Sequence, residues 1–187
     1  ASSSPLTGDL DSLKRLEDAG AAAVVLPSLF EEEVKHEAEE LEHYLHYGTE
    51  RFAESLTYFP EMREYHLDSE QYLDHVSRAC QTLDIPVIAS LNGVSIHTWS
   101  SFAKNVQQAG ADGIEINVYF LPTREDVSSA SVEEIYLKAL RAVKAVVQIP
   151  VAMKLSPYFS CLPSMAKQFD AEGVDSLVLF NRFYQPD

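Results

Sequence analysis

Polar side chains stand at the ends of three apolar segments, where they could hold a ligand. Lys154 lies in the run Val-Ala-Met-Lys-Leu, and a lysine in such a setting needs an anion from the protein or from a ligand. Glu115 and Asn117 share one face of the preceding segment, because side chains alternate along a strand, and Asn181 ends the last segment. Glu115 is an internal partner for Lys154, and this pair alone could fill the interior. The convergence of Lys154, Asn117 and Asn181 at successive strand ends indicates a ligand site instead.

Two alternating internal repeats predict the elements that position these side chains. In the first repeat a helix ends at a glycine and an apolar run follows, and in the second Ile-Pro-Val begins an apolar run. Glycine suits the left-handed residue that closes a helix, and proline is tolerated at the first residue of a strand. Strands that alternate with helices predict a parallel sheet covered by helices, with function at the carboxyl ends of the strands. The first repeat occupies residues 16–26, 106–116 and 169–179, and the second occupies residues 83–91 and 147–155.

The expected elements favour an incomplete barrel. Five strands are clear, and the stub of a sixth precedes Pro5. We therefore predict an α/β fold, a (βα)8 TIM barrel of which the chain holds about the first six βα units, and an open sheet of five or six strands is the alternative. One domain covers residues 1–187, with an insertion of helix and irregular loop at about 29–68, and Ser131 and Glu134 have the spacing of a helix cap. Helices are expected at residues 9–19, 31–47, 69–83, 95–109, 131–147 and 163–171, and strands at residues 21–26, 86–91, 113–118, 151–155 and 176–181.

Composition narrows the classes of partner. The 187 residues carry a net charge of −15, which would repel nucleic acid and anionic membranes. No apolar stretch is long enough to span a bilayer and no signal peptide is evident, so neither a nucleic acid nor a membrane is an expected partner. Cys80 and Cys161 lie far apart without metal-ligand spacing, which predicts two reduced thiols and a cytoplasmic location.

Three motifs resemble the dihydroorotate dehydrogenase family of FMN-dependent (βα)8 barrels. They are Glu115-Ile-Asn-Val, the run Val-Ala-Met-Lys-Leu-Ser-Pro-Tyr-Phe-Ser that begins at Val151, and Leu-Val-Leu-Phe-Asn, which ends at Asn181. The similarity runs over nearly the whole chain and is nearest to the branch described as dihydroorotate dehydrogenase-like. It implies an enzyme of the pyrimidine biosynthesis type, a small-molecule substrate, FMN as the cofactor and a homodimer. Lys154 would reach the N1/O2 edge of the flavin, and Asn117 and Asn181 would bind the flavin or the substrate.

The chain departs from the family where the catalytic base should stand. The family motif Asn-x-Ser-Cys/Ser-Pro-Asn carries a cysteine or serine base, whereas the run from Asn117 reads Asn-Val-Tyr-Phe-Leu-Pro. Phe120, or Leu121 if a gap is allowed, takes the place of the base, and neither side chain accepts a proton. The catalytic residue is therefore unknown, and the substitutes that the sequence offers are Tyr119, Thr123 and Cys161.

Two cofactor-binding features of the family are also missing. Pro27 and Ser28 stand where the family has a lysine followed by serine or threonine, so a second lysine beside the cofactor is absent. The phosphate of the cofactor binds after strands seven and eight of such barrels, which would lie beyond Asp187. We therefore expect a truncated barrel that binds FMN weakly on its own.

Three functions remain open at this point. The first is an FMN-dependent oxidoreductase that acts on a CH–CH bond of a small substrate. The second is a non-redox barrel that binds a small metabolite or a partner, and the third is a lyase or aldolase that forms a Schiff base on Lys154. A cluster of His36, His43 and His46 lies on a predicted acidic helix, but such a charge run is typical of a solvated face, and no metal site is expected.

Overall fold

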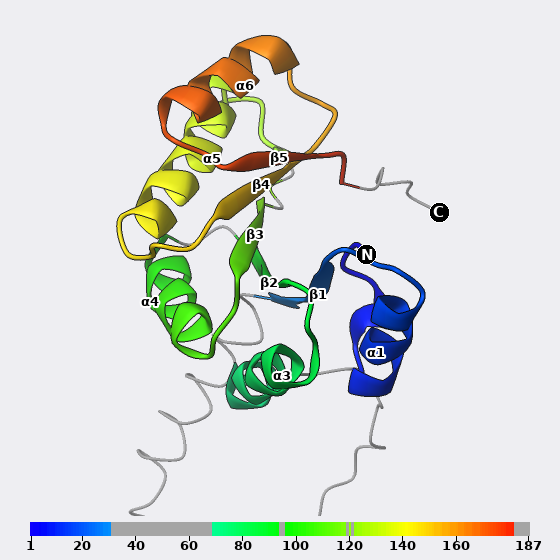
Figure 1. Cartoon of the computed structure of the whole chain (residues 1–187). Helices are drawn as coiled ribbons and strands as arrows, with labels where there is room; N and C mark the ends of the chain where they lie inside the picture. The colour runs from blue at the N-terminus through cyan, green and yellow to red at the C-terminus, as the bar shows by residue number, and fades with distance from the viewer. Residues whose placement is uncertain (31–68, 94–95, 119, 121, 182–187) are drawn as a thin grey trace, which may run out of the picture.

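Five parallel strands form one sheet in which the spatial order of the strands follows the chain (Figure 1). The computed structural model describes residues 1–30, 69–93, 96–118, 120 and 122–181. The strands are β1 Val24–Phe30, β2 Val87–Gly93, β3 Gly113–Val118, β4 Val151–Leu155 and β5 Ser176–Leu179.

Helices connect each strand to the next and gather on one side of the sheet. Figure 1 shows α4 and α5 along the left of the sheet, α6 above β5, α3 below the sheet and α1 at the lower right. The helices are the short 3-10 turn η1 Pro5–Thr7, α1 Leu10–Asp18, α3 Ser69–Thr82, α4 Ile96–Gln108, α5 Ser129–Lys144 and α6 Leu162–Ala171.

The strand order decides between the two architectures that the sequence left open. An open, doubly wound sheet reverses its order at a switch point, whereas a βα barrel adds every strand on the same side. The order β1-β2-β3-β4-β5 has no reversal, so the described residues form part of a (βα)n barrel, as predicted. The predicted stub before Pro5 is represented by Ala1, whose amino group donates to Ala23 O (2.7 Å) and whose carbonyl accepts from Val25 N (2.8 Å). Five strands are described, however, rather than six.

The internal repeats place equivalent side chains at the amino ends of the strands. Gly110 and Gly173 close their helices with φ of 103° and 77°, the left-handed conformation that was expected. Two residues after each glycine comes an aspartate that accepts the first N–H of the preceding strand. Asp112 Oδ2 lies 2.8 Å from Val87 N, and Asp175 Oδ2 lies 2.7 Å from Val151 N. These bonds stabilise the end of the barrel opposite the predicted site.

The two faces of the sheet differ in polarity. The face that packs against the helices is apolar, with Ile114, Ile116 and Met153 fully or almost fully buried. Glu115 and Lys154 alternate with these apolar residues along their strands. They therefore lie on the other face, which is the inner face of a barrel. Polar groups therefore line the inside of the sheet near the carboxyl ends of its strands.

Several predicted boundaries were wrong. β1 begins at Val24 rather than at residue 21 and runs to Phe30, so the predicted insertion at 29–68 would start inside this strand, and its remainder, 31–68, lies outside the described residues. Ser128 caps α5 instead of Ser131, because the Ser128 hydroxyl accepts from Ser131 N at 3.1 Å.

Candidate functional site

A buried ion pair joins β3 and β4 on the inner face. Lys154 Nζ donates to Glu115 Oε1 at 3.2 Å, and the two side chains are 11% and 3% exposed. Glu115 pairs with Ala152 in the sheet, two residues before Lys154, so the lysine side chain leans back along the strand to reach the carboxylate. The internal pair that the sequence offered as an alternative is thus present.

A hydrogen-bonded chain extends from this ion pair across β2 to β1. Ser90 Oγ donates to Glu115 Oε1 at 3.2 Å, and the hydroxyls of Ser28 and Ser90 are 2.8 Å apart. The Tyr72 hydroxyl holds Ser90 from the helix side, since it donates to Ser90 O (3.1 Å) and accepts from Ser90 N (2.9 Å). Tyr72 is fully buried, and burial raises the pKa of its phenol above the ordinary value, so it remains protonated.

An irregularity in β1 explains why a tyrosine reaches the main chain of β2. The register between the two strands shifts between Val25 and Ser28, a stretch that includes Pro27. Proline has no N–H to give to a ladder, and such residues occur at bulges. Tyr72 from α3 supplies the hydrogen bonds to Ser90 at this point, which orients the Ser90 side chain toward Glu115.

The two predicted asparagines converge on the same side of the sheet. Asn181 Nδ2 donates to Asn117 Oδ1 at 2.9 Å, although 64 residues separate them in the chain. Asn181 N also donates to Leu155 O at 2.8 Å, which holds Asn181 beside the carboxyl end of β4. Asn117 lies level with Lys154 in the sheet. The structure therefore brings Lys154, Asn117 and Asn181 together, as the sequence analysis expected.

Donor groups at this cluster have capacity for a ligand. An ammonium group has three N–H bonds, and Glu115 is the one acceptor that Lys154 Nζ meets among the described residues. The Asn117 amide accepts through Oδ1, and its NH2 group donates to no described residue. The Lys154 side chain is 11% exposed and Asn117 is 7% exposed among the residues described. Together they present unused donors on the inner face, which suits a carbonyl-bearing or negatively charged group.

Asn92 belongs to the same face. It lies near the end of β2, level with Asn117 in the sheet. The alternation of Ser90 and Asn92 with apolar neighbours was the signal that could have identified both as inner-face residues. Ser28 and Tyr72 carried no comparable signal, because their roles depend on the register of distant segments.

Among the described residues, no hydroxyl or thiol that the sequence offers as a substitute for the family base lies in the core. Phe120 is half-buried and packs against the core, while Thr123 and Cys161 are exposed. Tyr119 and Leu121 lie outside the described residues. None of the described positions places a proton acceptor beside Lys154 other than Glu115 itself.

The remaining candidates lie away from this cluster. Cys80 and Cys161 form no disulfide, as predicted, and burial raises the pKa of the Cys80 thiol to about 11. His36, His43 and His46 lie outside the described residues, in which no group of metal-binding side chains occurs. None of the described helices is long and apolar enough to cross a membrane.

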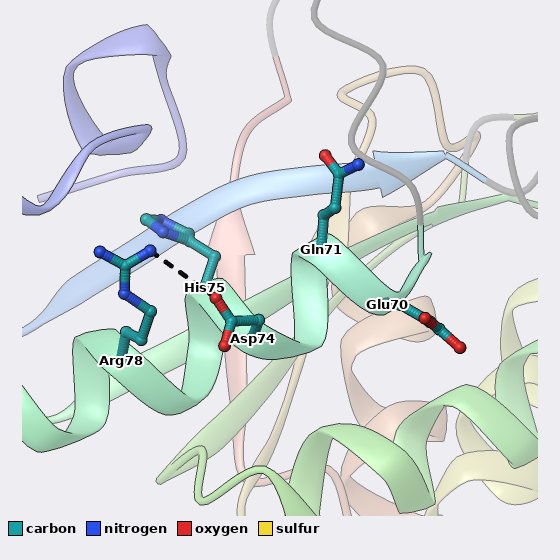
Figure 2. A pocket seen from close by; sticks show the side chains of 5 residues that line it. All are labelled: Glu70, Gln71, Asp74, His75 and Arg78. Carbon is teal, nitrogen blue, oxygen red and sulfur yellow. Dashed lines mark ion pairs between the residues drawn. The ribbon is translucent and has the colours of Figure 1, made fainter.

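An open hollow of about 500 Å³ lies along one side of α3 (Figure 2). His75 is half-buried, and its Nε2 atom meets no partner among the described residues. Burial lowers the pKa of this imidazole, which favours the neutral ring. Arg78 and Asp74 form an ion pair of 3.7 Å beside it. The side chains that line the hollow are Glu70, Gln71, Asp74, His75 and Arg78.

Sequence comparison relates the chain to dihydroorotate dehydrogenases. It is 30% identical over 100 residues to the catalytic subunit of dihydroorotate dehydrogenase B (NAD(+)) from Anoxybacillus flavithermus, a match that covers 52% of this chain and 32% of the relative. It is 30% identical over 107 residues to dihydroorotate dehydrogenase A (fumarate) from Lacticaseibacillus paracasei, covering 56% of this chain and 37% of the relative. No protein-family model matches. The predicted resemblance is confirmed over about half of the chain, and the matches span about a third of the relatives' own length.

Solved structures share the fold at low sequence identity. The complex of phosphonopyruvate hydrolase with oxalate and Mg²⁺ has a TM-score of 0.59 at 15% identity and covers 100% of this chain and 59% of that one. A dihydrodipicolinate synthase from Agrobacterium tumefaciens has a TM-score of 0.53 at 16% identity and covers 88% of this chain and 45% of that one. At this identity the likeness concerns the barrel fold alone.

Proposed function

We propose that the protein is an FMN-dependent oxidoreductase of the dihydroorotate dehydrogenase type, acting on a CH–CH bond of a small substrate. The observation that carries this proposal is the position of Lys154. It is an almost buried ammonium at the carboxyl ends of barrel strands, and Glu115 is the one acceptor that it meets among the described residues. The sequence similarity to dihydroorotate dehydrogenases supports the same class of reaction.

The described residues fit a flavin. When bound, FMN would supply an acceptor for a hydride from the substrate. Lys154 would donate to the N1/O2 edge, where negative charge develops on reduction, and a fixed cation in a low-dielectric site stabilises such charge. The Asn117 NH2 group and the Asn181 side chain would orient a ring that alternates C=O and N–H groups, because an amide offers both a donor and an acceptor.

In the family that this chain resembles, a cysteine or serine accepts the proton that leaves the substrate. This protein would need a different proton acceptor. Phe120 has no atom that takes a proton, and it packs against the core. We therefore propose a substrate whose reaction does not depend on a cysteine or serine base at this position. A small molecule with a planar, pyrimidine-like ring remains the class that the two asparagines suit best.

Absorption spectroscopy of the protein expressed from its complete reading frame tests the proposal. We expect flavin bands in the visible spectrum and release of FMN on denaturation, followed by bleaching when a substrate is added without oxygen. Lys154→Met should weaken FMN binding about tenfold, the equivalent of one charge-assisted hydrogen bond. Lys144→Met, which removes a lysine from the exposed pair with Asp175, is the matched control and should leave it unchanged.

A non-redox barrel is the second candidate, and the packing of Phe120 favours it. A barrel that had lost the dehydrogenase reaction would no longer need a base at this position. Phe120 accepts no proton and packs against the core, as expected of such a barrel. This candidate predicts a colourless protein that takes up no added FMN. Borohydride would trap a carbonyl compound on Lys154 only if the lysine formed a Schiff base, which separates the lyase alternative from both.

A further inference from the structure

Among the described residues, Glu115 is the most deeply buried charged group on the inner face and the direct neighbour of the proposed cofactor lysine. Its side chain is 3% exposed, and all six residues of β3 are buried. A single oxygen, Oε1, accepts from both Lys154 Nζ and Ser90 Oγ, each at 3.2 Å. The other oxygen, Oε2, accepts no hydrogen bond from the described residues. Among the described residues the carboxylate is therefore held through one oxygen, by the Lys154 ammonium from β4 and the Ser90 hydroxyl from β2.

The hydrogen-bonded chain behind Glu115 keeps this carboxylate in place. Ser28 and Ser90 come from β1 and β2, and Tyr72 fixes Ser90 through its main chain. Three elements, β1, β2 and α3, thus contribute to the orientation of one carboxylate. Packing of the core does not require such a chain, because apolar side chains of the same volume would fill the space without polar groups to satisfy.

A ligand that reaches Lys154 meets an ion pair rather than an isolated cation. At short distance the charge of a buried carboxylate offsets much of the field of its partner ammonium, and the offset is larger where the dielectric constant is low. Charge close to the flavin ring is one of the means by which proteins adjust its reduction potential. The strength of the positive charge at the site consequently depends on Glu115 as much as on Lys154.

We infer that Glu115 is a positioning residue that aims Lys154 into the site and limits the positive charge that Lys154 presents to bound FMN. This inference rests on the proposed function, since it concerns the cofactor of that function. Glu115 touches Lys154 and is assigned no contact with the ring. It sets the balance between affinity for oxidised FMN and affinity for the more negative reduced form.

The test is the midpoint potential of bound FMN in Glu115→Gln. Glutamine keeps the acceptor oxygen and the size of the side chain but removes the charge. We expect the ratio of affinities for reduced and oxidised FMN to rise about tenfold, an upward shift of about 30 mV for this two-electron couple. Lys154→Met should move the potential in the opposite direction. Glu172→Gln removes a carboxylate from the exposed pair with Arg141 and is the matched control, expected to change nothing.

Shifts of opposite sign in the midpoint potentials of Glu115→Gln and Lys154→Met distinguish this role from a structural one. If Glu115 served packing alone, both substitutions would loosen the site and neither would raise the potential, and that result overturns the inference while leaving the proposed function intact. If the glutamine variant does not fold, Glu115→Asp, which draws the carboxylate back by one methylene, must still raise the potential, and an unchanged or lowered value overturns the inference. A wild-type protein that binds no FMN overturns the proposed function and this inference together.

Discussion

Replacement of Lys154 by methionine should destabilise the fold in a way that reveals the buried ion pair. Methionine keeps most of the apolar stem, so the change is mainly the loss of the ammonium. Glu115, at 3% exposure, would then keep the Ser90 hydroxyl as its single described donor. Removal of one partner of a buried ion pair costs about 3–5 kcal/mol, and the 11% exposure of Lys154 places the expected loss near the lower end, about 3 kcal/mol.

Urea unfolding at neutral pH, followed by circular dichroism, measures this loss. Lys144→Met is the control, because Lys144 and Asp175 form a pair of 2.9 Å with side chains 32% and 42% exposed. Exposed pairs contribute about 0–1 kcal/mol, so this variant should lose no more than that. Asp175 would also retain its hydrogen bond from Val151 N.

The double variant Lys154→Met, Glu115→Gln completes the experiment. Because it removes the uncompensated charge, it should regain more than half of the stability that the single variant loses. A loss below about 1 kcal/mol in Lys154→Met, the size seen for exposed pairs, would refute the reasoning. So would a double variant that is less stable than the single one, since the buried carboxylate would then not be the cause.

Further predictions concern the opposite end of the barrel and the helix caps. Gly110→Ala should lose about 1 kcal/mol in urea unfolding, because φ is 103° while the nearest atom to an added Cβ is at an ordinary 3.8 Å. The Lys144 side chain and then the Val151 N–H lower the pKa of Asp175, so its contribution is present above the ordinary pKa of the carboxyl and is lost as the pH falls through the folded-state value. The melting temperature of Asp175→Asn should accordingly fall less than that of the wild type as the pH is lowered. An equal fall in both proteins would contradict this. Ser128→Ala should cost about 1 kcal/mol of unfolding free energy and Ser131→Ala less, since Ser128 is the helix cap, and the reverse order would contradict the cap assignment.

Much of the fold could be predicted from local sequence because barrels repeat the same local rules. Each glycine that ends a helix adopts a positive φ, and the apolar runs 113–118 and 151–155 are strands with the expected bounds. The start of β1 was predicted too early, because the apolar run Ala-Ala-Ala that precedes Val24 does not distinguish a strand from its connection. The cap of α5 was misplaced, since three serines stand close together and the sequence does not show which one has extended backbone.

The site was predictable only where its residues lie on strands with a regular register. Alternation along β3 and β4 places Glu115, Asn117 and Lys154 on one face, so their meeting follows from the sequence. The bond between Ser28 and Ser90 joins residues 62 apart and depends on an irregularity in the register of β1. Alternation alone does not reveal such a shift, and so the chain that holds Glu115 became visible only in the structure.

A crystal structure of the protein with FMN tests the central claim most directly. We predict that the flavin ring lies on the inner face of the sheet, with Lys154 Nζ in hydrogen-bond contact with the N1/O2 edge, the Asn117 amide within reach of the ring, and the Lys154–Glu115 pair intact. A ring bound elsewhere, or a Lys154 side chain that contacts only Glu115 while FMN is present, would contradict the account.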